Sequence, residues 1–425
     1  MTHPQPVDVA IVGAGIIGCS IALDLARRGL RVSVFERGAE AGQEQSSRAW
    51  GFVRQQGRHP AEIPLAAEAN ALWREMTAQR GLAATGFETN GILTPAETAE
   101  DEARIEAAHR DAAGFGLRTR ILSPPELKGL LPQLAGTWRG ALLTDGDGYA
   151  EPAAATATIA RLAAEAGVIL HTGHPVLGVA LRGGVVEGVE TAQGLCRAGA
   201  VVLANGVGAA GLGRRIGLAM PVQVVRSTVA GTAKAAPFTR LAMWGPRVAF
   251  RPRPDGSFVI GNGYRGAGAD YDITPNAWRH LRHFLPAYRR NWRQLRLTMG
   301  REFLGQMRAT GSAAPGEPPV NRAKLARNMA AFRALFPHLG ELPMERSWAG
   351  RIDLTPDVIP IIDRPWAGRD LYVAAGFSGH GFALAPSIGR QVAGWIADGH
   401  PGLDLSAFRL ARFTEGNAAG ARHSL

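Results

Sequence analysis

The chain has 425 residues, which is enough for two domains or for one large domain with an elaborate insertion. Its composition, 46% hydrophobic and 20% charged, is ordinary for a soluble globular protein. The formal net charge of +11 comes mostly from arginines that are scattered along the chain, so it does not indicate a nucleic-acid partner.

Composition also excludes several special kinds of segment. No apolar stretch approaches ~20 residues, so we expect no membrane span, and the N-terminus lacks the basic cluster of a signal peptide. Cys19 and Cys196 cannot make a disulfide framework, and no Cys/His spacing is typical of zinc. We therefore expect a cytoplasmic protein that holds no metal.

The first predicted elements are the most informative. A buried strand over 9–12 leads into Gly-Ala-Gly-Ile-Ile-Gly at 13–18, a helix over 19–28, and a strand over 31–35 that ends at Glu36. Gly13 permits the tight turn, Gly15 lets a pyrophosphate approach the backbone, and Gly18 lets the helix pack closely on the strand. Exposed N–H groups at the helix start suit phosphates, and the carboxylate of Glu36 suits a ribose diol. This unit predicts a dinucleotide site.

Helices and strands then alternate toward the middle of the chain. We expect helices over 61–79, 97–114 and 153–167, a strand over 89–95, and a short helix that ends near Leu131. A strand over 168–172, a hairpin over 176–190 and a buried strand over 200–203 follow. These return the chain to the nucleotide fold.

The pattern changes after residue 221. Alternation over 222–263, with turns at 252–256, predicts antiparallel sheet. Helical segments are expected over 276–297 and 322–336, separated by a loop at 312–319 that is rich in proline. Arginine concentrates here, and a solvated helix face or a partner-docking surface explains this cluster better than a duplex footprint does; its members are Arg279, Arg282, Arg289, Arg290, Arg293, Arg296 and Arg301.

The chain closes on a strand over 370–374, a glycine turn and a helix through 386–398. Nucleotide-type elements thus occur at the start, the middle and the end, with antiparallel sheet between them. We predict an α/β fold in which residues 1–90, 150–220 and 345–425 form a discontinuous nucleotide-binding domain. Residues 91–149 and 221–344 form a second, α+β domain.

Three segments together resemble the D-amino-acid oxidase and sarcosine oxidase (DAO) superfamily of FAD-dependent oxidoreductases. They are the N-terminal unit, Val-Val-Leu-Ala-Asn-Gly at 201–206, and the stretch from Thr-Pro-Asp at 355–357 to Gly-Phe-Ser-Gly-His-Gly-Phe at 376–382. The resemblance implies a Rossmann-type FAD-binding domain, like that of glutathione reductase, and a substrate domain whose antiparallel sheet roofs the flavin. The last glycine turn would aim a helix N-terminus at the flavin ring.

The resemblance also implies which residues hold the cofactor. The adenine, ribose, pyrophosphate and flavin would be held by Gly13, Ala14, Gly15, Ile16, Ile17, Gly18, Glu36, Arg37, Ser46, Ser47, Arg48, Trp50, Gly51, Val176, Ala204, Asn205, Gly206, Gly350, Gly376, Phe377, Ser378, Gly379, His380, Gly381 and Phe382.

Three departures from the family pattern carry information. Sarcosine oxidases attach flavin through a cysteine where this chain has Gly350, so we expect FAD to be noncovalent. Ala383 replaces their substrate-binding lysine, which leaves Arg54 and Arg351 as candidates for a substrate carboxylate. Val259 replaces the lysine associated with oxygen activation, which favours a dehydrogenase over an oxidase.

The implied reaction oxidises a C–N bond by hydride transfer to flavin N5, and the imine product then hydrolyses. The expected substrate is an amino acid or a secondary amine, such as an N-alkyl, proline-like or opine-like compound. His59 and His380 are candidates for accepting the ammonium proton, or they are structural. Trp50, Tyr149, Tyr264 and Trp348 are candidates for the pocket wall, or they are core residues.

Other readings stay open at this stage. The same fold oxidises hydroxy acids or alcohols, and it also serves as the flavin-bearing subunit of multi-subunit amine dehydrogenases. The first glycine motif alone also fits a nicotinamide enzyme. The electron acceptor (oxygen, a quinone or a carrier) and the oligomeric state, homo-oligomer or hetero-oligomeric subunit, are not set by the sequence.

Overall fold

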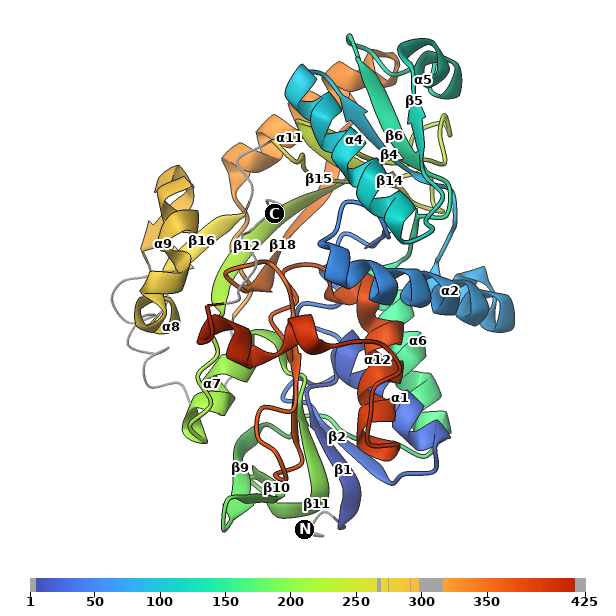
Figure 1. The fold of residues 1–425 in the computed structure, drawn as a ribbon. Helices are drawn as coiled ribbons and strands as arrows, with labels where there is room; N and C mark the ends of the chain where they lie inside the picture. Colours follow the sequence, from blue (N-terminus) through green and yellow to red (C-terminus); the bar gives the residue numbers. More distant parts are fainter. Residues whose placement is uncertain (1–4, 266–268, 274, 291, 298–315, 417–425) are drawn as a thin grey trace.

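The computed structural model describes residues 5–265, 269–273, 275–290, 292–297 and 316–416. Two large β-sheets dominate it, one of eight and one of ten strands. Figure 1 shows the first sheet with its helices in the lower half and the second sheet in the upper half. The predicted fold class, an α/β fold with a mostly parallel sheet and a second sheet domain, is confirmed.

The first sheet is a doubly covered, mostly parallel sheet. Its main path runs β19-β20-β11-β1-β2-β8, and β9 and β10 extend it as an antiparallel hairpin from β11. The strands are β1 (Val7–Val12), β2 (Val32–Phe35), β8 (Ile169–His171), β9 (Val176–Arg182), β10 (Val185–Thr191), β11 (Gly194–Leu203), β19 (Ile361–Asp363) and β20 (Leu371–Ala375).

Both faces of β1 are buried from Val9 to Val12, which explains why these four residues are all apolar. Val9 and Ile11 pack against α1 (Ile16–Arg27), α6 (Pro152–Glu165) and α12 (Gly381–Ala397), which lie side by side in Figure 1. Ala10 and Val12 face the opposite side, toward α7 (Ala209–Arg215) and the β9–β10 hairpin. The first helix thus begins at Ile16, three residues before the predicted start, because the glycine turn runs directly into it.

The second sheet is mainly antiparallel. Its path is β17-β16-β12-β15-β14-β13-β4-β6-β5, and β18 pairs with β12. The strands are β4 (Ile92–Ala96), β5 (Arg120–Leu122), β6 (Gly140–Thr144), β12 (Gln223–Thr232), β13 (Ala242–Trp244), β14 (Val248–Pro252), β15 (Phe258–Asn262), β16 (Asp270–Ile273), β17 (Leu295–Leu297) and β18 (Met344–Leu354).

Helices cover this sheet and join it to the first. Phe250 and Phe258 of the sheet pack against Phe332 and Phe336 at α11. The remaining helices are α2 (Ile63–Arg80), α3 (Leu82–Thr85), α4 (Ala99–Gly114), α5 (Pro124–Leu130), α8 (Pro275–Arg279), α9 (Leu281–Arg290) and α11 (Arg322–Leu335). Short 3₁₀ turns lie at Pro60–Glu62, Gly206–Gly208, Trp292–Gln294, Pro337–Leu339, Ser406–Phe408 and Leu410–Phe413, and β3 (Phe52–Val53) pairs with β7 (Gly148–Tyr149).

Two segments differ from the sequence-based expectation. Strand β18 pairs with β12 along its whole length, so residues 345–354 lie in the second sheet although we assigned them to the nucleotide-binding domain. The helical segment expected over 276–297 ends earlier, because Leu295–Leu297 pair in parallel with β16. Arg301 and residues 312–315 of the expected loop lie outside the described residues.

A buried ion pair fixes the C-terminal turns to the first sheet domain. The Arg412 guanidinium donates to both carboxylate oxygens of Asp357, at 2.8 and 3.2 Å. It also donates to the carbonyls of Ile359, Phe408 and Arg409. Because both charged groups are buried and fully hydrogen-bonded, this contact is a firm tether.

Candidate active site

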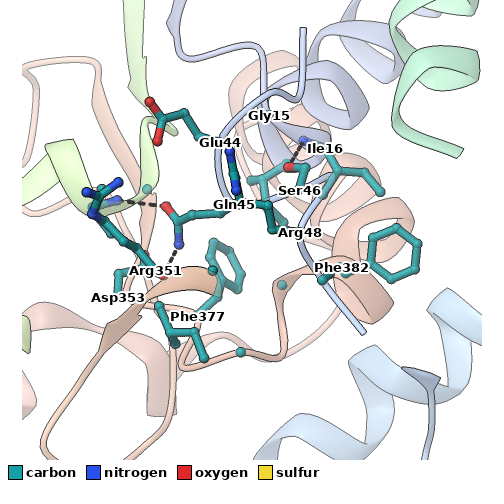
Figure 2. A pocket seen from close by; sticks show the side chains of 18 of the residues that line it. Gly15, Ile16, Glu44, Gln45, Ser46, Arg48, Arg351, Asp353, Phe377 and Phe382 are labelled. Atoms are coloured by element: carbon teal, nitrogen blue, oxygen red, sulfur yellow. Dashed lines mark hydrogen bonds between the residues drawn. The ribbon is translucent and has the colours of Figure 1, made fainter. Parts of the chain in front are cut away.

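A long cavity runs from the glycine turn after β1 to the underside of the second sheet. Its walls come from the first sheet domain (β1, β2, β9 and β20), the loop 42–58, β12, β15 and β18, and the turn before α12. Figure 2 looks into this cavity. Segments that are far apart in the sequence therefore line one continuous space.

Glycines shape the first end of the cavity. Gly13 has φ +100°, and a Cβ there would lie 2.8 Å from the Ala204 carbonyl oxygen. A Cβ on Gly18 would lie 2.0 Å from the Gly13 carbonyl oxygen, so only glycine lets α1 approach β1 this closely. The Ser46 hydroxyl accepts the Ile16 N–H at 2.9 Å (Figure 2). The structure thus builds the narrow backbone cradle that the motif predicts.

Glu36 closes the nucleotide end, directly after β2. Its carboxylate accepts the N–H groups of Ala14 at 2.9 Å and Gly38 at 2.7 Å, and it lines the cavity beside Arg37 and Val176. The fixed carboxylate lies at the end of a parallel strand, where a ribose diol is held in dinucleotide folds.

Gln45 links three parts of the wall and was not predicted from the sequence. Its side-chain oxygen accepts the Val207 N–H at 2.9 Å, and its nitrogen donates to Asp353 Oδ1 at 2.9 Å (Figure 2). Asp353 Oδ2 in turn accepts the Gly376 N–H at 2.6 Å. Burial raises the pKa of Asp353, whereas these hydrogen bonds lower it. A polar residue next to Ser46 was the only local signal.

The turn before α12 presents backbone to the cavity. Gly376, Ser378 and Gly379 all have positive φ, and at Ser378 (φ +53°) this conformation is unusual for a residue with a side chain. The Ser378 N–H donates to the Asp353 carbonyl at 2.9 Å, and its hydroxyl lies 3.2 Å from that of Thr355. Hydrogen bonds to the Thr-Pro-Asp segment therefore hold the turn in place.

The residues present fit a dinucleotide cofactor. The backbone of Gly13 and Gly15 lines the cavity and leaves room for a ligand to approach it closely. Asn205, which also lines the cavity, has a buried Oδ1 without a protein hydrogen-bond partner. The helix N-termini of α1 and α12 open on the same cavity, where their dipoles favour anionic groups. These features indicate phosphate at one end and a charge-accepting ring system near the other.

The far end of the cavity has a cationic wall. Arg54 stacks its guanidinium over the Trp244 ring, 4.2 Å from the centroid. It donates to the carbonyls of Gln56 at 3.1 Å and Gly57 at 2.9 Å. Burial and, to a smaller extent, the neighbouring Arg58 together lower the pKa of Arg54 to about 9. At neutral pH the group keeps its positive charge.

Behind this wall lies a buried charged cluster of Arg58, Glu62, Asp147 and His380, which we call the buried cluster. Glu62 Oε1 lies 2.9 Å from His380 Nδ1 and 3.9 Å from the Arg58 guanidinium. Glu62 Oε2, Asp147 Oδ2 and one Arg58 nitrogen are buried without a protein partner. Such groups are rare in folded proteins and point to polar ligands or water in the site.

Electrostatics within the buried cluster set its protonation. Burial lowers the pKa of His380, whereas the carboxylate of Glu62 raises it. The pKa of Glu62 is low because His380 and the two arginines outweigh its burial. Burial raises the pKa of Asp147 to about 6, although Gln55 donates two hydrogen bonds to it. Only His380 and Arg58 of this cluster line the cavity.

Arg351 lies at the mouth, where it donates to the Gly316 carbonyl at 2.7 Å. Arg48 pairs nearby with Glu317 and donates to the Ala349 carbonyl at 3.3 Å. Figure 2 shows Arg48 and Arg351 on different walls of the cavity. Arg54, Arg351 and His380 are thus the predicted catalytic residues that the structure brings to the cavity.

The other three predicted catalytic residues do not line it, and their side chains have structural partners. His59 Nδ1 accepts the Ala61 N–H at 3.2 Å, which caps the turn at Pro60–Glu62. The Tyr264 hydroxyl donates to the Pro95 carbonyl at 2.7 Å, and Trp348 donates to the Arg48 carbonyl at 3.1 Å.

The cofactor residues divide in the same way. Tyr149, proposed as a wall aromatic, does not line the cavity: it is a buried residue of β7, and its hydroxyl donates to the Arg240 carbonyl at 3.1 Å. Four of the predicted cofactor residues shape the cavity from behind rather than line it: Ala14, Gly18, Ser47 and Gly376. All the others line the cavity. Sequence reasoning missed Gln45, Arg58, Trp244, Asn262 and Asp353, which also line it.

The fold and this cavity define an oxidoreductase that binds a flavin dinucleotide. The family model for FAD-dependent oxidoreductases (DAO) matches residues 8–395, so the chain belongs to that family. Its cofactor is FAD, and the predictions of family, enzyme class and cofactor are confirmed. The nicotinamide alternative is thereby removed.

Individual relatives are distant but cover the whole chain. A glycine oxidase from Geobacillus kaustophilus is 27% identical over 97% of this chain and 98% of its own length. A 4-methylaminobutanoate oxidase from Paenarthrobacter nicotinovorans is 27% identical over 97% of this chain, which spans only 46% of that relative. The solved L-proline dehydrogenase from P. horikoshii is 25% identical and superposes with a TM-score of 0.81, covering 97% of this chain and 99% of that one.

Within the described residues, no helix combines the length and the apolar character needed to cross a bilayer. In the same part of the chain, no three metal-ligating side chains converge on one point.

Proposed function

We propose that the protein oxidises the C–N bond of a small amino acid or N-substituted amino acid, with FAD bound noncovalently. The observation that carries this proposal is Arg54. Its largely buried guanidinium lines the same cavity as the turn before α12, and among the described residues its hydrogen bonds go to backbone carbonyls rather than to a carboxylate. A buried guanidinium of this kind suits the carboxylate of an incoming substrate.

The relatives support the amine class. Their names describe oxidation of glycine, of 4-methylaminobutanoate and of L-proline, all of which join an amine to a carboxylate. Among the departures from the family pattern noted above, Val259 in place of the lysine associated with oxygen activation favours electron transfer to an acceptor other than oxygen. We propose a dehydrogenase, whose acceptor is to be found by experiment.

The chain's own residues would orient and deprotonate the substrate. Bound FAD would supply the two-electron acceptor for a hydride. Arg54 would hold the carboxylate, and Trp244 and Trp50 would exclude water from the reacting carbon. His380 Nε2 would take the ammonium proton, with Nδ1 held on Glu62. Residues 1–90, 150–220 and the part of 345–425 that follows β18 would carry FAD, and the second sheet would roof the substrate.

Anaerobic bleaching of the flavin tests this proposal. The purified yellow protein is mixed with amino acids, N-methyl amino acids, the matching decarboxylated amines, and hydroxy acids, and absorbance is followed near 450 nm. We expect bleaching by one or more carboxylated amines only. Bleaching by hydroxy acids alone would favour the alcohol-oxidising alternative.

The variant Arg54→Leu tests the role of the arginine. Because a charge-assisted bond contributes ~1.5–3 kcal/mol, the apparent Kd for the carboxylated substrate should rise ~10–150-fold. The slow reaction of the decarboxylated amine, which has no carboxylate to hold, is the control and should not change. An equal loss for both compounds would contradict the assignment. Oxygen consumption against dye reduction then separates oxidase from dehydrogenase.

A further inference from the structure

The outer face of α8, α9 and the following turn carries an unusual mixture of side chains. Trp278 is 53% exposed, Leu285 39% and Trp292 64%, and all three belong to the largest exposed apolar residues of the described chain. They fall within fifteen positions of one another. Large aromatic side chains this exposed are uncommon in a protein that has no partner there.

Arginines alternate with these apolar residues on the same face. Arg279, Arg282, Arg289 and Arg293 are exposed, and together with Trp278, Leu285 and Trp292 they form what we call the Trp/Arg face. Trp278 lies on α8, and Trp292 opens the 3₁₀ turn that follows α9. Between them, Arg282, Leu285 and Arg289 follow one another at steps of three or four residues, which places these three on one side of α9.

The inner face of the same segment is firmly anchored. Ala277, Phe284 and Tyr288 are buried against Val225, Tyr271 and Leu354 of the second sheet. The Tyr288 hydroxyl also donates to the Gln223 side chain. Figure 1 shows α8 and α9 at one side of the molecule, beside β16 and β12. The Trp/Arg face is therefore presented outward by α8, α9 and the following turn, of which α8 and α9 are packed against the second sheet.

Its charge has one sign. The sequence contains no aspartate or glutamate between Asp272 and Glu302. Among the described residues, the four arginines of the Trp/Arg face have no carboxylate within ion-pair distance, unlike the exposed Arg120 and Arg161, which pair with Asp145 and Glu165. The Arg293 guanidinium lies over the Trp292 ring, 5.0 Å from its centroid. The face thus offers uncompensated positive charge next to apolar rings.

We propose that the Trp/Arg face docks on the surface of an anionic lipid membrane. A helix lying in the membrane interface combines tryptophan and leucine, which enter the headgroup region, with arginines that meet lipid phosphates. Tryptophan is enriched at that depth because its ring is apolar and its N–H is polar. The Trp/Arg face points outward from anchored helices, so it can lie against a broad surface such as a membrane. Its positive charge favours a membrane that contains anionic lipid.

Vesicle sedimentation tests this proposal with the FAD-loaded protein. Phosphatidylglycerol–phosphatidylcholine vesicles are compared with pure phosphatidylcholine vesicles, at low and at high salt. We expect binding to the anionic vesicles only, weakened by salt. Since each arginine near such a surface contributes about 1 kcal/mol, R282Q/R289Q should bind ~30-fold more weakly. W278S/W292S should lose binding even at low salt.

Matched variants elsewhere on the surface serve as controls. R110Q/R161Q removes two exposed arginines and F115S/I169S removes two exposed apolar residues, and both should bind vesicles as the parent protein does. Flavin content and circular dichroism verify that each variant is folded. Equal binding by all variants, or none by the parent, would overturn the proposal. Binding to soluble poly-glutamate is measured as well. If the parent protein binds poly-glutamate through the Trp/Arg face but does not bind vesicles, the partner is an acidic protein and the membrane proposal is wrong.

Discussion

Glu62→Gln offers the sharpest test of how the buried cluster works. Glu62 is only 1% exposed and holds His380 Nδ1 at 2.9 Å. The substitution keeps the shape of the side chain and removes its charge. We infer that Glu62 is a positioning residue that fixes the orientation of the imidazole and strengthens it as a base.

The size of the effect follows from the interactions that are lost. A hydrogen bond to a charged group contributes about 1.5–3 kcal/mol, so flavin reduction at saturating substrate should slow ~10–150-fold. The pKa of His380, already lowered by burial, loses the upward influence of the Glu62 carboxylate. A base with a lower pKa stays deprotonated to lower pH, so the acid limb of the pH–rate profile should shift to lower pH.

Stopped-flow measurement of anaerobic flavin reduction across pH provides the assay. Glu68→Gln is the control, because Glu68 accepts hydrogen bonds from the Ser387 and Gln391 side chains on α12 and does not line the cavity. Glu62→Asp, which keeps the charge, should recover part of the rate. If E62Q retains its FAD and shows the wild-type plateau and the wild-type acid limb, then His380 and Glu62 do not handle the proton, and this reasoning is refuted.

Three further predictions concern the scaffold. Gly18→Ala places a Cβ 2.0 Å from the Gly13 carbonyl oxygen and should abolish FAD retention. Gly211→Ala on α7, where a Cβ has no atom within 4 Å, is the control and should keep its FAD. The flavin absorbance that remains after dialysis measures the retained FAD. Arg412→Ala leaves Asp357 buried without its partner and should cost ~3–5 kcal/mol of unfolding free energy, against at most ~1 kcal/mol for the exposed Arg409→Ala, in denaturant titrations. Asp147, with its pKa raised to about 6, binds a proton more tightly when folded, so this group's contribution to stability is lost as pH rises from about 4 to 6. The melting temperature of Asp147→Asn relative to wild type should therefore rise over that interval, and a constant difference would contradict the raised pKa.

The nucleotide half of the fold could be predicted because its signals are local. The Gly13–Gly18 turn and the acid at the end of β2 are fixed by spacing within one strand–helix–strand unit. The turn at 376–382 could be predicted for the same reason, since Gly376 and Gly379 have positive φ angles that glycine adopts readily. Backbone constraints of this kind determine residue types at fixed spacing within a short segment, so they can be recognised from the sequence alone.

The substrate end could not be predicted in the same detail. The buried cluster draws Glu62 from a 3₁₀ turn, Asp147 from the loop before β7 and His380 from the start of α12. His380 was predicted because it lies in the glycine turn at 376–382, whereas nothing beside Glu62 or Asp147 in the sequence marked them as its partners. Only tertiary packing brings the three residues together. Strand β18 was missed because its first four residues are exposed and carry no alternation of apolar and polar side chains.

The order of strands in the first sheet has a consequence for how the protein is made. Strands β1, β11 and β20 are immediate neighbours, although they begin at residues 7, 194 and 371. A ribosome therefore releases the opening glycine turn hundreds of codons before the helix that completes the cofactor cradle. Until β20 and α12 have been synthesised, the nascent polypeptide has no complete cofactor pocket, and the edge of β11 that pairs with β20 stays unpaired. We therefore expect the chain to bind FAD only after its last third has been synthesised, so that a shortage of FAD affects the completed chain rather than the nascent one.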